Sequence, residues 1–264
     1  MAVSPNAGPP LQLTLEQYEK IIPTSAVEHE GKKMVFATPS MFTLWRVQSI
    51  RTKEPWTLEW IATFAPGEIL LDCGANVGMY TIWAAVTRDC PVYAFEPEAQ
   101  NYAILNRNIQ LNGVAGRVKA YCMGLSDVTG LSQLHMADMR VGGSNHSLGE
   151  ALDFEHKPLA AQFVQGCYGA KLDELVGAGA IPVPNHIKID VDGFEPKVIA
   201  GARGTLRDPA VKSLLIETNQ NLEDHMSMVA DLNALGFRHD AAQVTRAERK
   251  SGTFRGVAEY VFRR

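Results

Sequence analysis

Four carboxylates stand at or just past the ends of strand-like runs, where their side chains could bind a ligand. They are Asp72, Glu96, Asp127 and Asp190. A buried carboxylate must find hydrogen-bond donors or shift its pKa, so four such groups at strand ends are costly as packing alone. In a doubly wound sheet, ligands bind in the crevice beyond the carboxyl ends of the strands. The four acids therefore predict a binding site at one edge of a sheet.

A glycine turn follows the first of these acids in the stretch LLDCGANVGMYT, residues 70–81. Gly74 allows a tight turn with positive φ, and Gly78 allows the next helix to begin close to a ligand. Dinucleotide sites add a middle glycine so that the backbone can approach a pyrophosphate, and here that position is Asn76. Glu96 lies near the spacing of about 20 residues expected for an acid on ribose hydroxyls. The pattern predicts a nucleoside with an amino-acid tail in place of pyrophosphate, and S-adenosylmethionine fits that description.

The elements that must position these residues alternate between strand and helix from residue 68 onward. Expected strands are 68–74, 91–97, 117–127, 185–196, 211–219 and 256–264, and expected helices are 79–88, 98–112, 196–206 and 226–237. Such alternation predicts an α/β fold with a mostly parallel sheet under helices on both faces. We expect no helix before the last strand, which should pair near residues 237–241. This final pair predicts an antiparallel edge.

The chain divides into a tail, a cap and a main domain. We expect residues 1–10 to form a disordered tail. Residues 11–66 carry a helix at 13–22, a strand at 32–40 and two further helical stretches, which we interpret as an N-terminal helical cap. Residues 67–264 form the main domain. A long segment of it, 128–170, lies between the third and fourth strands, and we expect it to be an insertion or lid.

Composition and charge argue against several classes of protein. The chain has 264 residues, with 29 Asp and Glu against 25 Lys and Arg, a net charge of −4 that gives no general attraction to nucleic acid. No stretch approaches the ~20 apolar residues of a membrane span, and the N-terminus lacks the pattern of a secretory signal. We expect a cytoplasmic protein with reduced cysteines. No histidine pair has a zinc spacing, so no metal is predicted; Mg²⁺ at Asp190, Asp192 and Glu195 is the weaker alternative.

Five segments together resemble the FkbM-type methyltransferases of the class I fold. They are LLDCGANVGMYTIWAA, VYAFEPEAQNYAILNRNIQLNG, GLSD, KLDEL and IKIDVDGFEPKVIAGARGTL. The resemblance covers roughly residues 54–219. It implies a Rossmann-like fold with a seven-stranded sheet, S-adenosylmethionine as cofactor, and O-methylation of a hydroxyl on a sugar, secondary metabolite or other small molecule. One position departs from the family pattern, because Asp192 stands where KIDVEG has glutamate.

The resemblance also implies which residues hold the methionine end of the cofactor. Asp72 and Gly74 would lie by the amine, and Asp190 would lie nearest the sulfonium and the acceptor. The full set assigned to the cofactor is Asp72, Gly74, Ala75, Asn76, Gly78, Thr81, Glu96, Pro97, Ser126, Asp127 and Asp190.

The adenosine end involves the second and third strand ends. By the same resemblance, Glu96 would accept hydrogen bonds from both ribose hydroxyls, and Pro97 would pack on the adenine. Ser126 and Asp127 would meet the adenine edge, with its amino group donating to Asp127. The nature of the acceptor and the oligomeric state stay open.

Transfer to a hydroxyl also requires a base within about 2.6–3.2 Å of the proton. We predict Asp190 as base or acceptor-orienting group, with a pKa that Asp192 and Glu195 could raise. His146, in the flexible-looking VGGSNHSLG loop, is the second candidate, and Glu195 completes the predicted catalytic set. Two rival functions remain: a protein that binds the nucleoside without chemistry, and a nicotinamide-dependent oxidoreductase, which Asn76 disfavours.

Overall fold

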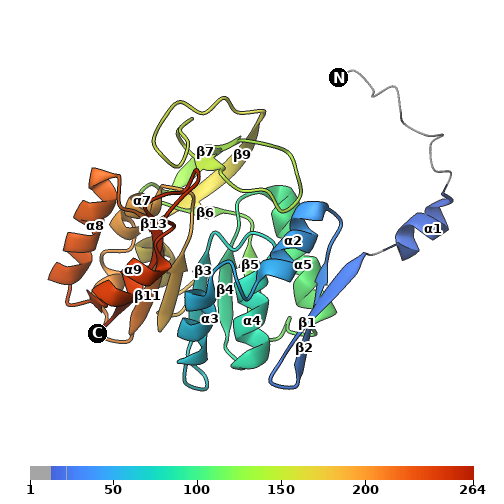
Figure 1. Cartoon of the computed structure of the whole chain (residues 1–264), viewed down its shortest axis with the longest axis horizontal. Coiled ribbons are helices and arrows are strands. Elements are labelled where there is room, and N and C mark those ends of the chain that lie inside the picture. Colours follow the sequence, from blue (N-terminus) through green and yellow to red (C-terminus); the bar gives the residue numbers. More distant parts are fainter. Residues whose placement is uncertain (1–12, 22) are drawn as a thin grey trace.

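The fold is built on a seven-stranded sheet in a computed structural model that describes residues 13–21 and 23–264 (Figure 1). Its strand order is β12 (Arg238–His239), β13 (Val257–Arg263), β11 (Ser213–Asn219), β10 (His186–Ile189), β3 (Leu70–Cys73), β4 (Val92–Phe95) and β5 (Val118–Tyr121). The five strands from β11 to β5 are parallel, and β13 is antiparallel to both neighbours. The order reverses between β3 and β10, which makes the carboxyl ends of these two strands the expected binding crevice.

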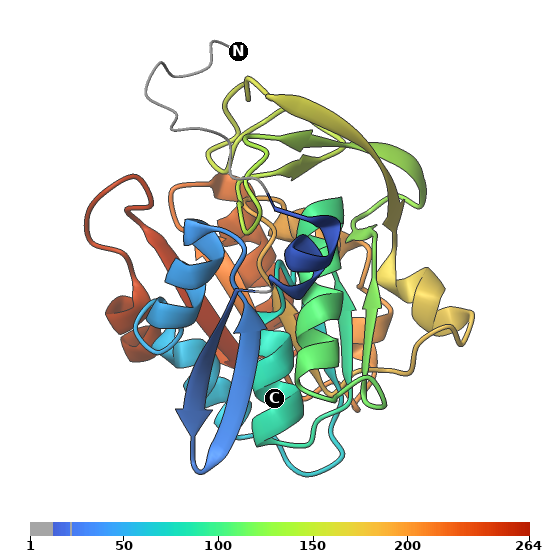
Figure 2. The ribbon, with the colours of Figure 1, turned by 90° about the vertical axis from the view of Figure 1, so that its right-hand side faces the viewer.

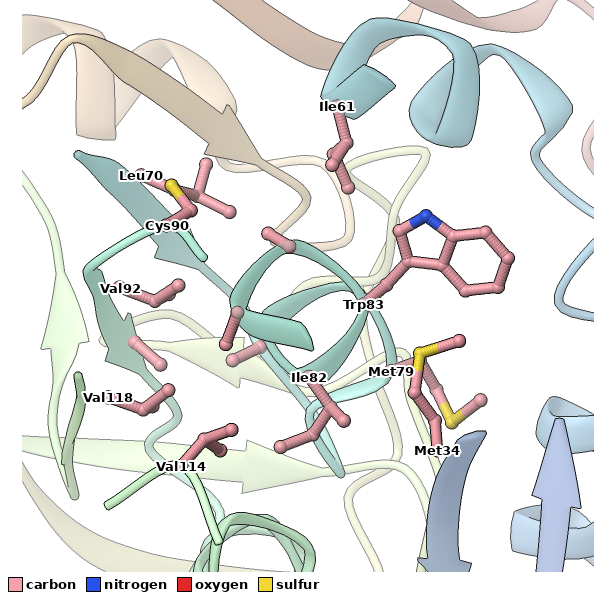
Figure 3. Close-up of a cluster of buried hydrophobic side chains, with 14 of the residues drawn as sticks. Met34, Ile61, Leu70, Met79, Ile82, Trp83, Cys90, Val92, Val114 and Val118 are labelled. Atoms are coloured by element: carbon pink, nitrogen blue, oxygen red, sulfur yellow. The ribbon is translucent and has the colours of Figure 1, made fainter. Parts of the chain in front are cut away.

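Helices cover both faces of this sheet. They are α4 (Met79–Thr87), α5 (Ala99–Leu111), α6 (Leu172–Gly177), α7 (Glu195–Ala200), α8 (Glu223–Ala234), α9 (Ala241–Ala247) and the 3-10 turn η1 (Thr205–Arg207). Successive strand side chains point to opposite faces, so Leu70 packs in one apolar core and Leu71 in the other. Figure 3 shows the first core, where Ile82 of α4 lies near Val114 and Val118. The predicted Rossmann-like α/β fold is confirmed.

The last strands differ from the expected arrangement. Helix α9 lies between β12 and β13, although no helix was expected there, and Asp240 caps it by accepting from the backbone amide of Ala242 at 2.8 Å. The antiparallel strand β13 is one position in from the edge, because the two-residue β12 pairs along its outer side. A helix this short carries too little periodicity to stand out in the sequence.

The N-terminal segment is only partly helical, in contrast to the predicted cap. It holds α1 (Leu15–Lys20), α2 (Met41–Ser49) and α3 (Pro55–Ala62), but β1 (Thr24–His29) and β2 (Lys32–Ala37) form an antiparallel hairpin. Glu30 and Gly31 make its turn with positive φ, a two-residue signal that the sequence reading overlooked. Figure 2 shows this hairpin in blue beside the green α5. The predicted tail, residues 1–10, lies outside the described residues.

The segment 128–170 is a small sheet rather than a long loop. Its three strands pair with β6 (Gly124–Leu125), which precedes the segment, in the order β6, β9 (Phe163–Ala170), β7 (Gly130–Met136) and β8 (Ser147–Leu148). β6 runs parallel to the end of β9, so the segment leaves and rejoins the main domain at adjacent points. Figure 1 places β7 and β9 at the top of the view, beyond the main sheet. The insertion therefore covers the edge where the binding crevice is expected.

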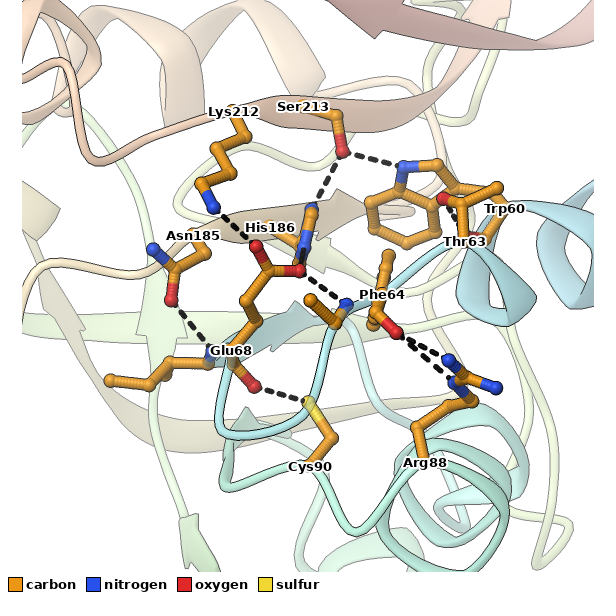
Figure 4. A network of polar contacts seen from close by, with 12 residues as sticks. Trp60, Thr63, Phe64, Glu68, Arg88, Cys90, Asn185, His186, Lys212 and Ser213 are labelled. Carbon is orange, nitrogen blue, oxygen red and sulfur yellow. Dashed lines mark hydrogen bonds and ion pairs between the residues drawn. The ribbon is translucent and has the colours of Figure 1, made fainter.

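A network of polar contacts joins α3 to the opposite, amino-terminal end of the sheet (Figure 4). Trp60 donates from Nε1 to Ser213 Oγ at 2.8 Å, and Ser213 hydrogen-bonds His186 Nδ1 at 2.8 Å. His186 Nε2 meets Glu68 Oε2 at 2.8 Å, and Lys212 pairs with the other oxygen of Glu68. Burial raises the pKa of Glu68, but these partners outweigh it and bring the pKa down to about 2. Every polar side chain of this network has a partner.

Two further findings concern the chain as a whole. Within the part of the chain that the structure describes, no helix is long and apolar enough to cross a bilayer. The four cysteines, Cys73, Cys90, Cys122 and Cys167, carry free thiols.

Candidate active site

A cavity of about 490 Å³ opens at the carboxyl edge of the main sheet. Its wall comes from the loops after β3, β4 and β10, from α2, from the end of β11 and from the loop of the insertion that precedes β8. The predicted residues on this wall are Gly74, Asn76, Glu96, Pro97, Ser126, His146 and Asp190. Ala75 borders a smaller adjoining space, while Asp72, Gly78, Thr81, Asp127 and Glu195 line neither.

Gly74 and Gly78, the two glycines of the turn, are each required by contact with a different part of the chain. Both have the predicted positive φ, 78° at Gly74 and 82° at Gly78. A Cβ on Gly74 would lie 1.9 Å from the carbonyl oxygen of Asp190, so the loops after β3 and β10 touch at the point where the strand order reverses. A Cβ on Gly78 would lie 2.4 Å from Leu105 Cδ1. Gly78 therefore allows close packing on α5, and the predicted approach to a ligand is not what it provides.

Asp72 and Thr81 form a buried pair beneath the cavity. Thr81 Oγ1 donates to Asp72 Oδ2 at 2.5 Å, and Asp72 is 1% exposed. Burial raises the pKa of Asp72, although the charge of Lys188 opposes the shift. This contact between β3 and α4 satisfies one oxygen of Asp72, while Oδ1 is buried without a partner in the protein, so the predicted contact with the cofactor stays a prediction.

Glu96 presents a carboxylate to the cavity from the end of β4. Its Oε2 accepts from the backbone amide of Asn76 at 2.7 Å and its Oε1 from that of Glu98 at 2.9 Å. Burial raises the pKa of Glu96 to about 8, because these two amides do not fully compensate the lost hydration. A carboxylate held in place and facing a cavity can accept from ligand hydroxyls. Nearby, Ser126 lies on the wall and donates to Asp127 Oδ1 at 3.1 Å. Asp127 itself does not line the cavity.

The loop after β10 carries two carboxylates with opposite electrostatics. Asp190 pairs with Lys188 at 2.9 Å; burial raises its pKa, but the charges of Lys188 and Lys53 outweigh that and lower the pKa below its usual range. Asp192, with φ of 53°, accepts from the backbone amide of Asn145 at 2.7 Å. Burial and the charge of Asp190 raise its pKa to about 6. A carboxyl with a lowered pKa is a weaker base than one with a raised pKa, so the predicted role of Asp190 as a base is less favoured than its role as an orienting group.

Glu195 is buried beneath this loop and hydrogen-bonds its backbone. It is 1% exposed, and its carboxylate accepts from the backbone amides of Val191 at 2.8 Å and Gly193 at 3.1 Å. Burial raises its pKa to about 8. These contacts hold the turn before α7, so Glu195 shapes the loop that presents Asp192 and does not itself face the cavity as we had predicted.

His146 faces the cavity from the insertion as a hydrogen-bond donor. Its Nδ1 accepts from the backbone amide of Ala137 at 3.3 Å, which puts the proton of the neutral ring on Nε2. Burial lowers its pKa, so the ring is neutral near pH 7. Nε2 is buried without a partner in the protein, as is Oδ1 of Asn145 beside it. A ring with this tautomer can donate from Nε2 to a ligand, whereas the predicted role as a base would need the other tautomer.

Charged residues that sequence reasoning did not assign also reach the cavity. Lys53 and Arg249 line it, and Arg249 pairs with Glu217 at 2.7 Å. Burial raises the pKa of Glu217 well above its usual range. These residues come from segments nearly 200 positions apart, so no local pattern links them.

Two groups of described residues have ligand atoms close enough to hold a metal ion. In the first, Glu54, Glu217 and Glu259 already surround Lys53 and Arg249. The second is His156, Asp224 and His225. There, His225 accepts from the backbone amide of residue 219 and donates to the carbonyl oxygen of residue 193, so neither ring nitrogen is free. We assign no metal to either group.

The topology and the carboxyl-edge cavity together define a class I methyltransferase fold. The sequence profile described as the Methyltransferase FkbM domain matches residues 72–239. The match extends over more than half of the chain, and the chain belongs to this family. S-adenosylmethionine, predicted from the glycine turn, is thereby confirmed as the cofactor.

Curated relatives carry methyltransferase names. Hexuronic acid methyltransferase AglP of Haloferax volcanii is 24% identical over 196 residues, 74% of each chain. The 31-O-demethyl-FK506 methyltransferase FkbM of Streptomyces tacrolimicus is 24% identical over 198 residues, 67% of this chain and 75% of that one. Among solved structures, Methyltransferase FkbM from Methylobacillus flagellatus is 15% identical, with a TM-score of 0.47 over 76% of this chain and 44% of that one.

Proposed function

We propose that the protein transfers a methyl group from S-adenosylmethionine to a hydroxyl oxygen of a small molecule or glycan. The observation that carries the proposal is Asp192, a carboxylate on the cavity wall whose pKa is raised to about 6. Transfer to an alcohol needs a base for the departing proton, and a base is most effective when its pKa lies near the working pH. The names of two relatives, a hexuronic acid and a 31-O-demethyl-FK506 methyltransferase, support an oxygen acceptor.

The residues on the wall fit the cofactor by their chemistry. The carboxylate of Glu96 offers acceptors for ribose hydroxyls, the positive φ of Gly74 brings backbone to the cavity surface, and Pro97 offers an apolar face. When bound, S-adenosylmethionine supplies a methyl group already activated by a sulfonium. The protein's share of the chemistry is therefore positioning and proton removal.

The insertion and the sheet divide this work. Asp192 would take the hydroxyl proton, with its carboxylate held by the amide of Asn145. His146 would donate from Nε2 to an oxygen of the acceptor and so orient it. Phe42, Trp45 and Phe254 supply apolar wall on which a sugar ring or hydrocarbon could pack. Phe42 and Trp45 belong to α2, His146 belongs to the insertion and Phe254 precedes β13, so these three segments would determine which acceptor enters.

The test combines binding with transfer. Titration calorimetry with S-adenosylhomocysteine, NAD and NADP is expected to give binding of the first alone. Radiolabelled methyl transfer to hexuronic acids, neutral sugars and macrolide diols is then expected to label an oxygen, located by NMR of the product. Binding of NAD alone would favour the oxidoreductase, and binding of S-adenosylhomocysteine with no transfer to any acceptor would favour a non-catalytic binder. Label on nitrogen or carbon would refute O-methylation.

A further inference from the structure

A small branch space adjoins the main cavity at the glycine turn. It measures about 40 Å³, and its lining includes Arg46, Lys53, Gly74, Asn76 and Asp190. The same five residues border the main cavity, so the two spaces adjoin. A space of this size holds a few heavy atoms, such as a carboxylate, and excludes a sugar ring or a nucleobase.

The charges around this branch point to one unmatched cation. Lys188 pairs with Asp190 at 2.9 Å, and Lys53 pairs with Glu54. Arg46 also borders the branch, but among the described residues no carboxylate lies within ion-pair distance of it. Its Nε donates to the carbonyl oxygen of Gly142 at 2.7 Å. Within the described residues, this is the one hydrogen bond of the Arg46 side chain. The two terminal nitrogens of a guanidinium form a fork that suits a carboxylate.

We infer that Arg46 binds the methionine carboxylate of S-adenosylmethionine. The inference rests on the proposed function only in that this cavity takes the cofactor. The methionine tail carries an ammonium and a carboxylate, and the branch offers Asp190 for the first and Arg46 for the second. The N-terminal segment thus contributes to the cofactor site directly, although none of its residues was predicted to do so.

Contacts with the insertion fix the direction of the Arg46 side chain. Ser40 caps α2 and donates from Oγ to the carbonyl oxygen of Val141 at 2.6 Å, one residue before the partner of Arg46. The backbone amide of Gly142 donates in turn to Asn101 Oδ1 at 2.8 Å. A Cβ on Gly142 would lie 2.8 Å from Thr43 Cγ2, so glycine is needed for this approach. Arg46 is therefore held by the loop at residues 141–143 before any ligand binds.

A pair of ligands isolates this contact. S-adenosylhomocysteine has the amino-acid tail, and 5′-methylthioadenosine lacks it. For Arg46→Ala we expect calorimetric affinity for S-adenosylhomocysteine to fall on the order of tenfold to a hundredfold, as for the loss of a hydrogen-bonded charge pair. Affinity for 5′-methylthioadenosine should stay within about twofold, because no group of that ligand reaches the branch. Arg46→Lys should restore part of the lost affinity.

Arg140→Ala is the matched control. This neighbouring arginine also joins the insertion to α2, since its guanidinium lies 4.2 Å from the centre of the Phe42 ring, but it does not line the cavity. We expect it to bind both ligands as the wild type does, and circular dichroism on all variants reports folding.

Three results would overturn the assignment. Equal loss of both ligands in Arg46→Ala would make Arg46 a structural residue. Unchanged affinity for S-adenosylhomocysteine with a raised KM for the acceptor would assign it to the acceptor. Loss of S-adenosylhomocysteine affinity in Arg140→Ala as well would assign the effect to the insertion. Failure of the proposed function looks different, because the wild type would then bind neither ligand or would bind both and methylate no hydroxyl.

Discussion

The two ends of the main sheet each hold a histidine beside carboxylates, and the two rings differ in how far the protein itself satisfies their nitrogens. At the amino-terminal end, both ring nitrogens of His186 have partners in Ser213 and Glu68. At the carboxyl end, Nε2 of His146 is buried with none. Buried polar groups are normally paired, and the exceptions gather where a ligand completes them. The difference is consistent with a structural role for His186 and with a ligand beside His146.

The carboxylates at the two ends differ in the same way. Lys212 and His186 overcome the effect of burial on Glu68 and bring its pKa down to about 2. Glu96 and Asp192 lack such close cations, and burial raises their pKa values to about 8 and about 6. Perturbed carboxylates of this kind gather at sites that bind ligands or transfer protons.

The largest expected effect comes from Asp192→Asn. If Asp192 is the base, kcat/KM for methyl transfer should fall on the order of 10²- to 10³-fold. The wild-type value should rise with pH through about 6 and level off above it, because the base works when deprotonated. The variant should lose that rise while binding S-adenosylhomocysteine normally. Glu155→Gln, on the exposed part of the insertion, is the control. A wild-type rate in Asp192→Asn would place the base elsewhere.

Glu96→Ala should weaken the cofactor next most strongly. The change removes the acceptor for two ribose hydroxyls, and each hydrogen bond is worth about 0.5–1.5 kcal/mol below the raised pKa of about 8, where the carboxyl is neutral. Calorimetric affinity for S-adenosylhomocysteine and for 5′-methylthioadenosine should fall together by about tenfold or more, because both ligands keep the ribose. Affinity equal to the wild type would show that Glu96 does not bind the ribose.

The two ends should also respond to pH in opposite directions. The pKa of Glu68 is lowered by folding, so its stabilising contribution is present above its ordinary pKa and is lost as pH falls toward about 2. The pKa of Glu96 is raised, so stability is lost as pH rises from its ordinary pKa through about 8. Urea unfolding of the cofactor-free protein measures this. Relative to Glu68→Gln, the wild type should lose about 1–3 kcal/mol in acid.

Glu96→Gln provides the other half of that comparison. Relative to this variant, the wild type should lose stability as the pH rises from about 5 to about 8. Parallel pH dependences in the two comparisons would mean that the ends do not differ electrostatically.

The smallest effect is expected from His146→Ala. Loss of a neutral donor is worth about 0.5–1.5 kcal/mol, which corresponds to a rise of about two- to tenfold in the acceptor KM. The pH at which kcat/KM rises should not move, because His146 holds its proton on Nε2 and does not act as a base. Steady-state kinetics across pH checks both points. A shift of that pH, or its disappearance, would return His146 to the role of base.

Local patterns predicted the parts of the site that depend on local structure. The acids at strand ends and the positive φ of Gly74 follow from residues that are close in the chain. The prediction of S-adenosylmethionine as cofactor followed from the same residues. Gly78 was predicted to approach a ligand because the sequence of the turn does not indicate that Gly78 packs on Leu105 of the next helix. The role of His146 depended on a tautomer set by Ala137.

Residues that act through distant contacts could not be predicted. Arg46 depends on Gly142, and Arg249 depends on Glu217, pairs that only the folded chain brings together. The insertion was expected to be a loop because β7 and β9 place many apolar residues in the open. Leu131, for example, is 93% exposed although burial alternates along β7, so the apolar residues of this sequence do not mark the buried face of the strand.

The parallel pairing of β6 with the end of β9 makes the insertion a separable module. Gly124 lies opposite Gly169 and Leu125 opposite Ala170, and the backbone amide of Ser126 donates to the carbonyl oxygen of Ala170 at 2.9 Å. Residues can therefore be added or removed between these points without changing the path of any main-sheet strand. Glu96 and Asp192 stay on loops of the main sheet, while His146 lies on the module. Descendants of one ancestor could thus exchange acceptors through changes in this segment and keep a single methyl donor.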